Sequence, residues 1–138
     1  MKYIYVAGPY TKGDVAINVR HNIEVADKLA CAGYVPFVSL LTHFWHLVCP
    51  HPYEFWLTQD AEWIERCCAL IRMPGESSGA DKEIILAESL KRPIYRYEGE
   101  FLIEDFNKWA EWQRYCRVSG ADPNQSLYSQ ARAKHENR

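Results

Sequence analysis

The first forty residues alternate apolar runs with one amphipathic stretch. Tyr3 to Ala7 is a short run of β-branched and aromatic residues ended by Gly8-Pro9, which predicts a buried strand followed by a sharp turn. From Val15 to Ala32, apolar residues recur three or four positions apart and predict a helix. Tyr34 to Leu41 is again typical of a strand.

The rest of the chain repeats this alternation. It predicts, in order, a loop rich in rings and histidines over 42–52, a helix over 53–66, a strand over 67–73, a loop over 74–79, a helix over 81–90, a strand over 93–97 and a helix over 101–118. Strands that alternate with helices indicate right-handed β-α-β units, hence an α/β fold with a parallel sheet of four to five strands and helices on both faces. We expect one domain over 1–118 and a polar C-terminal tail over 119–138.

Three distinctive loops follow strands of the predicted sheet. They are Gly8-Pro9-Tyr10, the 42–52 segment and the 74–79 segment. Ligands of parallel sheets bind outside the carboxyl ends of the strands, so we expect these loops to converge on one site.

The loop before the 81–90 helix has features of an anion site. Ser78 and Asp81 form an approximate capping box, and Gly79 permits the turn. Helix capping alone explains these residues, without any function. A capped helix start also presents free N–H groups, however, and these suit a phosphate. Glu83, about one turn inside the helix, is then either a pocket carboxylate or a solvated surface residue.

Asp60 is the second carboxylate of interest. It falls between Trp56 and Trp63, which have the helical spacing of core or interface residues, as do Trp109 and Trp112. A lone acid on that face is unusual unless it is paired or functional. Two carboxylates in one pocket permit cleavage at an anomeric carbon, since one attacks the sugar and the other handles the leaving-group proton.

Three segments, in order over roughly residues 3–97, resemble the nucleoside 2-deoxyribosyltransferase superfamily and are most similar to its 2'-deoxynucleoside 5'-monophosphate N-glycosidases. They are Tyr3–Pro9, Gln59–Ile64 and Ser77–Glu83. The resemblance implies a doubly wound, flavodoxin-like (Rossmann-like) sheet in a homodimer or higher homo-oligomer. It also implies cleavage of the N-glycosidic bond through a covalent sugar–enzyme intermediate, with no metal or organic cofactor.

The same resemblance implies roles for individual residues. Glu83 is the expected nucleophile, Asp60 the acid that assists departure of the base or positions the sugar, and Tyr5 the tyrosine that contacts the nucleophile. Ser77 stands where phosphate-using members carry serine and free-nucleoside transferases carry aspartate. A serine hydroxyl can donate to a 5'-phosphate that an aspartate would repel. His43 matches a pocket histidine of the monophosphate hydrolases.

The remaining site residues come from the converging loops. Phe44, Trp45 and His46 either stack on a base or anchor an interface between subunits. The expected substrate-binding residues are Gly8, Pro9, Tyr10, His43, Phe44, Trp45, His46, Ser77, Ser78 and Gly79. Two departures from the family pattern stand out: Cys68 replaces a frequent aspartate, and the first turn lacks the arginine and paired glycines of the phosphate hydrolases, where Lys12 could substitute.

Composition narrows the class of protein. A formal charge of -2 argues against a binder of nucleic-acid polymers that acts through a basic field. Apolar runs are too short for a signal peptide or a membrane span, and five cysteines without a CxxC spacing favour reduced, mostly buried thiols in a cytoplasmic protein. A metal site at His43, His46 and His51 lacks a familiar spacing. An aromatic content of 14% suggests that some rings line a site.

The expected function is therefore an N-glycosidase acting on a (deoxy)nucleoside 5'-monophosphate. Hydrolysis and transfer of the sugar to a second base differ only in what captures the sugar on Glu83, so a transferase stays open. A nucleotide-binding domain without turnover is the second alternative, and a protein-interaction domain is the third.

Overall fold

The computed structural model describes residues 1–125 of the 138-residue chain. In chain order, the elements are β1 (Tyr3–Ala7), α1 (Val15–Cys31), β2 (Val35–Val38), the 3-10 turn η1 (Ser39–Leu41), α2 (Thr42–Val48), α3 (Tyr53–Arg66), β3 (Ala69–Arg72), α4 (Ser78–Ser89), β4 (Ile94–Arg96) and α5 (Ile103–Ser119). The alternation of strands and helices follows the expected order.

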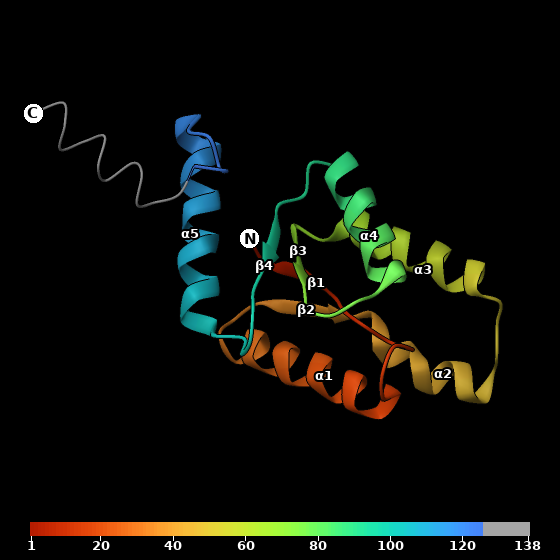
Figure 1. Cartoon of the computed structure of the whole chain (residues 1–138). Coiled ribbons are helices and arrows are strands. Elements are labelled where there is room, and N and C mark those ends of the chain that lie inside the picture. The colour runs from red at the N-terminus through yellow and green to blue at the C-terminus, as the bar shows by residue number, and fades with distance from the viewer. Residues whose placement is uncertain (126–138) are drawn as a thin grey trace, which may run out of the picture. The chain divides into compact units, whose positions relative to one another are not determined.

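The four strands form one parallel sheet in the order β2-β1-β3-β4. Tyr5 pairs in register with Phe37 of β2 and with Leu70 of β3. Helix α1 lies on one face of the sheet, and α3 and α4 lie on the other (Figure 1). The chain therefore has the doubly wound, flavodoxin-like α/β fold that the sequence predicts.

The central strands are buried on both faces, as parallel sheets require. Ile4, Tyr5, Val6 and Ala7 have no exposed surface, and neither have Ala69, Leu70 and Ile71 of β3. Side chains alternate along a strand, so Tyr5 and Ala7 share one face. This face packs against α3 and α4 in a cluster that includes Ile64 and Ala80.

Several local expectations were wrong. The strand expected over Tyr34–Leu41 ends at Val38, because Ser39–Leu41 form the 3-10 turn η1. The 42–52 segment is not all loop, because Thr42 to Val48 form the short helix α2. Helix α4 starts three residues before the expected Asp81, and its N-cap is Ser77 rather than Ser78, since Ser77 Oγ accepts the N–H of Ala80 at 3.1 Å. Asp81 does not close a capping box, because its carboxylate pairs with Arg72.

The chain divides into two compact units, residues 1–103 and residues from Glu104 onward. The second unit holds nearly all of α5, whose Trp112 Nε1 donates to the carbonyl of Pro123 at 3.2 Å. The polar tail was expected over 119–138. Its first residue, Ser119, is the last residue of α5, and residues 126–138 lie outside the described residues.

Burial differs from expectation for two cysteines and for one tryptophan. All five cysteines lie in the described part of the chain as free thiols, but only Cys67 and Cys116 are buried, whereas Cys31 and Cys49 are exposed. Trp63 is not a core residue: it is 46% exposed and stacks on Phe37 from the surface. Across residues 1–125, none of the helices has the length and apolarity needed to cross a membrane.

Candidate active site

A hydrogen bond between β1 and α4 forms the centre of the site. Tyr5 faces the α4 side of the sheet, and its hydroxyl donates to Glu83 Oε1 at 2.8 Å. Burial, followed by the charges of Glu83 and Asp60, raises the pKa of Tyr5 well above its ordinary value. The hydroxyl therefore stays protonated and remains a hydrogen-bond donor to the glutamate.

Asp60 reaches the same place from α3, which packs alongside α4. Its Oδ1 atom is buried without a hydrogen-bond partner among the described residues. Burial raises the pKa of Asp60 to about 6, while its interactions with Glu83 and Tyr5 act in the opposite sense. A buried carboxyl oxygen without a partner is costly for stability, which is typical of a functional position.

Glu83 and Asp60 titrate as a pair. Burial, followed by the Asp60 charge, raises the pKa of Glu83 to about 8, although the Tyr5 hydroxyl and the positive charge of Arg72 favour its ionised form. Two adjacent carboxyls with raised pKa values share one proton near neutral pH. The pair can thus supply one carboxylate and one acid at the same time.

The carboxyl pair opens into a cavity of about 450 Å³ at the carboxyl edge of the sheet. This volume lies in the usual range for small-molecule sites. The lining residues come from the chain segments that follow β1, β2 and β3. They are Gly8, Tyr10, Thr11, Lys12, Ser39, Leu40, Thr42, His43, His46, His51, Tyr53, Trp56, Leu57, Asp60, Glu76, Ser77, Ser78, Gly79, Ala80 and Glu83.

The N-terminus of α4 forms one part of the cavity wall. Ser77 accepts the N–H of Ala80 with its hydroxyl, and its carbonyl accepts the N–H of Asp81. The N–H groups of Ser78 and Gly79 have no acceptor inside the helix and are available to a ligand. A Cβ at position 79 would lie 3.3 Å from the Tyr53 hydroxyl, so glycine keeps this approach open. The arrangement suits an anion.

A buried arginine fixes the turn that leads into α4. Arg72, at the end of β3, donates to the carbonyls of Met73 and Gly75 and to Asp81 Oδ1, at 3.0 Å for the last two. Gly75 has φ +111°, and a Cβ there would lie 2.9 Å from Pro9 Cγ. Arg72 thus ties together β3, the turn and the first turn of α4.

The turn after β1 is stabilised by hydrogen bonds from an asparagine side chain of α1. Asn18 Nδ2 donates to the carbonyls of Tyr10 and Lys12, at 2.9 and 2.8 Å. Lys12 Nζ lies 3.6 Å from Glu76 Oε1 in an exposed ion pair at the mouth of the cavity. The one cation in the wall is therefore already paired with a carboxylate in the described structure.

Histidines and a tryptophan form the wall on the α2 side. The Tyr10 hydroxyl bonds with His43 Nδ1. His46 Nδ1 accepts the indole N–H of Trp56 at 3.0 Å and the backbone N–H of His51 at 3.2 Å. Trp56, expected in the core or an interface, lines the cavity instead.

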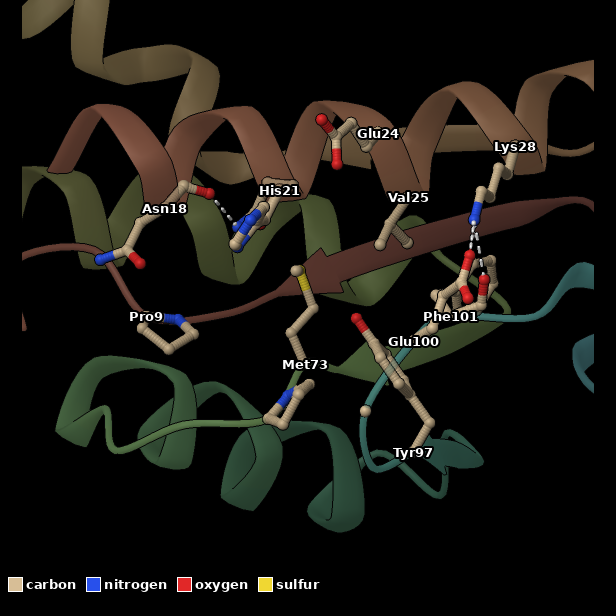
Figure 2. Close-up of a pocket in the computed structure, with 13 residues that line it drawn as sticks. Pro9, Asn18, His21, Glu24, Val25, Lys28, Met73, Tyr97, Glu100 and Phe101 are labelled. Carbon is tan, nitrogen blue, oxygen red and sulfur yellow. Dashed lines mark hydrogen bonds and ion pairs between the residues drawn. The ribbon is translucent and has the colours of Figure 1, made fainter. Parts of the chain in front are cut away.

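Three of the expected binding residues lie away from the described cavity wall. Phe44 and Trp45 are 57% and 49% exposed, and Trp45 packs edge-on against Phe55 and Trp56. Pro9 lines a second cavity of about 280 Å³ beside α1, with Met73 and Tyr97 (Figure 2). The other seven are in the wall, and Tyr5 lies behind Glu83.

Some site residues were missed from the sequence. Ser39 directly follows β2 and is buried at the cavity, which its place after a strand at the sheet edge could have indicated. Arg72 is a charged residue at the end of the apolar run of β3, and this position could have indicated that it has a role near the site. Over residues 1–125, no three histidine, cysteine or acidic side chains are placed to hold a metal ion.

Comparison with known proteins gives a structural likeness. No protein-family model and no curated protein matches the chain. Among solved structures, the fold is similar to that of a 2-deoxyribosyltransferase from the psychrotolerant bacterium Bacillus psychrosaccharolyticus, with a TM-score of 0.54 and 18% sequence identity. The likeness covers 72% of this chain and 76% of that one. The chain thus has the α/β fold of a deoxyribosyltransferase.

Proposed function

We propose that this protein is an N-glycosidase that cleaves the base–sugar bond of a (deoxy)nucleoside 5'-monophosphate. The observation that carries the proposal is the hydrogen bond from Tyr5 to Glu83, with Asp60 beside it, in a cavity that also holds the N-terminus of α4. The fold of the deoxyribosyltransferase neighbour supports the same class of chemistry.

The first half of the reaction uses both members of the carboxyl pair. The Glu83 carboxylate attacks the anomeric carbon and forms an ester, while the carbon–nitrogen bond breaks and its electron pair passes to the base. The higher pKa of Glu83 places the shared proton on Glu83 in the free protein, so this proton passes to Asp60 before the attack and from Asp60 to the departing base. The Tyr5 hydroxyl orients Glu83 and favours its ionised form.

The second half restores the enzyme. Water attacks the anomeric carbon, Asp60 accepts its proton, and the ester bond breaks so that Glu83 leaves as a carboxylate. A second base in place of water would give transfer instead. In both halves the substrate phosphate binds the N–H groups of Ser78 and Gly79 and the Ser77 hydroxyl, with Lys12 at the mouth.

The test is base release from a panel of ribo- and deoxynucleoside monophosphates, followed by chromatography. Glu83→Gln keeps the volume and the acceptor for Tyr5 but removes the nucleophile, so we expect kcat to fall by about 1,000-fold or more. Glu88→Gln, at an exposed position of the same helix, is the matched control and keeps full activity. Wild-type activity in Glu83→Gln contradicts the proposal.

Two additional measurements separate the alternative functions, and a third tests whether the 5'-phosphate is used. Exchange of a labelled free base into the nucleotide identifies a transferase. Nucleotide binding by calorimetry with no product over hours identifies a binding domain without turnover. The corresponding free nucleosides, run beside the monophosphates, show whether the α4 N-terminus is used for a 5'-phosphate. The free thiols are in keeping with a cytoplasmic location.

A further inference from the structure

His46 has a fixed pattern of hydrogen-bond partners at one ring nitrogen. Both groups that contact Nδ1, the Trp56 indole N–H and the His51 backbone N–H, are donors that cannot accept. Nδ1 must therefore offer a lone pair to them, and the proton of the neutral ring resides on Nε2. The partners determine the tautomer without reference to any ligand.

His43, one helical turn away, lacks this constraint. Its Nδ1 faces the Tyr10 hydroxyl, which can either donate or accept. Either tautomer of His43 satisfies that contact. Of the two histidines that α2 contributes to the cavity wall, only His46 has its donor and acceptor ends set by the fold.

The Nε2–H of His46 remains available. His46 is partly buried in the cavity wall, and within residues 1–125 its Nε2 makes no hydrogen bond. The packing around it limits rotation, because Trp56 lies edge-on to the ring at a centroid distance of 5.6 Å. The Nε2–H is thus a donor without a protein acceptor among the described residues, on a side chain of the cavity wall.

We propose that His46 is a specificity-determining residue that donates its Nε2–H to a hydrogen-bond acceptor, a ring nitrogen or a carbonyl oxygen, on the base of the substrate. This inference rests on the proposed function and specifies which ring nitrogen of His46 forms the hydrogen bond with the base. Heterocycles without an acceptor at that edge leave a partly buried donor unpaired and bind less well.

The same contact strengthens during the reaction. Negative charge accumulates on the base as the carbon–nitrogen bond breaks, so a donor already in place stabilises the transition state more than the bound substrate. Loss of His46 therefore lowers kcat as well as affinity. A residue that only packed beside the base would act mainly on KM.

The tautomer is measured first, in the free protein. Long-range ¹H–¹⁵N spectra of histidine-labelled wild-type protein distinguish the two ring nitrogens, with His46→Gln used to assign the signals. We expect His46 to show a pyrrole-type Nε2 and a pyridine-type Nδ1. The opposite pattern overturns the proposal whatever the activity.

The role in recognition is tested by pairing His46 variants with substrate analogues. In the analogues of the best substrate, one acceptor of the base at a time is replaced by C–H. For wild type, we expect one analogue to lose about 10-fold in kcat/KM, and for His46→Phe we expect that analogue and the parent to react equally. His46→Gln, whose amide nitrogen lies near the position of Nε2, recovers part of the discrimination.

His21→Phe is the matched control, because His21 is exposed on α1 and lines the other cavity. It should keep the wild-type analogue profile. An equal analogue penalty in wild type and His46→Phe overturns the role of His46 and leaves the proposed function intact. A wild-type protein that neither cleaves nor binds nucleotides overturns the proposed function, and the recognition role with it.

Discussion

At the residue scale, the buried carboxyl pair of Glu83 and Asp60 lowers the stability of the folded protein. Glu83 and Asp60 are forced together under the sheet edge, where burial penalises their charged forms. Asp60 Oδ1 also lacks a partner in the described structure. Such an arrangement survives in a fold when it serves a function, and its removal should stabilise the protein.

Glu83→Gln should therefore raise the melting temperature. The folded-state pKa values are raised, so the native protein keeps a proton that the unfolded chain has lost, and stability falls as pH rises from about 4 through about 8. The variant removes this loss while its amide oxygen still accepts from Tyr5. We expect a gain of a few degrees at pH 8 that disappears near pH 4, measured by calorimetry.

Glu88→Gln controls for the change of charge on α4. Its side chain is exposed, so its melting temperature should follow that of wild type at every pH. A Glu83→Gln protein that is no more stable than wild type at pH 8 would contradict the burial cost assigned to the pair.

The sequence indicates single residues well where a position follows from topology. Topology placed Tyr5 on a buried strand but left Glu83 either in the pocket or on the surface, and only the family resemblance predicted the contact between them. Trp56 could not be placed, because helical spacing fixes a face but does not tell a core-facing position from one beside a cavity. Trp63 shows the same limit, since its ring covers Phe37 from the surface.

At the element scale, the approach of α4 to the cavity depends on Arg72. Its guanidinium is enclosed, with 8% of the side chain exposed, and it bonds to the turn and to the first turn of the helix. Arg72→Met leaves two turn carbonyls unpaired. We expect the free energy of unfolding to fall by about 2–4 kcal/mol, measured by urea denaturation.

Asp81→Asn is the companion variant. The Asp81 side chain is 65% exposed, so its ion pair contributes little by itself, and the loss should stay below about 1 kcal/mol. Equal losses in the two variants would show that the ion pair, and not the turn carbonyls, accounts for the role of Arg72.

Element boundaries were predictable to within a few residues, and the errors have local causes. Two adjacent serines stand at the start of α4, and only the geometry shows that Ser77 caps the helix while Ser78 is its first residue. Helix α2 was missed because seven residues are too few for a periodic pattern to distinguish a helix from a loop. Short helices depend on tertiary contacts rather than on intrinsic preference.

At the scale of the whole molecule, the cavity is assembled from segments far apart in the chain. The rule that loops after parallel strands share one edge was sufficient to group three of them from sequence. It could not say which side chains of a loop turn inward. Phe44, Trp45 and His46 were all expected at the cavity, but of these three only His46 lines it.

Helix α2 provides the last prediction, which concerns assembly. In the described structure none of its residues is buried, and Phe44, Leu47 and Val48 are 57%, 66% and 80% exposed. The helix carries no acidic, lysine or arginine residue, so a second copy can approach the same patch without opposing charge. We expect a homodimer at micromolar concentration by analytical ultracentrifugation, and Leu47→Glu with Val48→Glu should give a monomer. Val118→Glu, at an equally exposed apolar position on α5, should leave the dimer unchanged, and a monomeric wild type would refute this assembly.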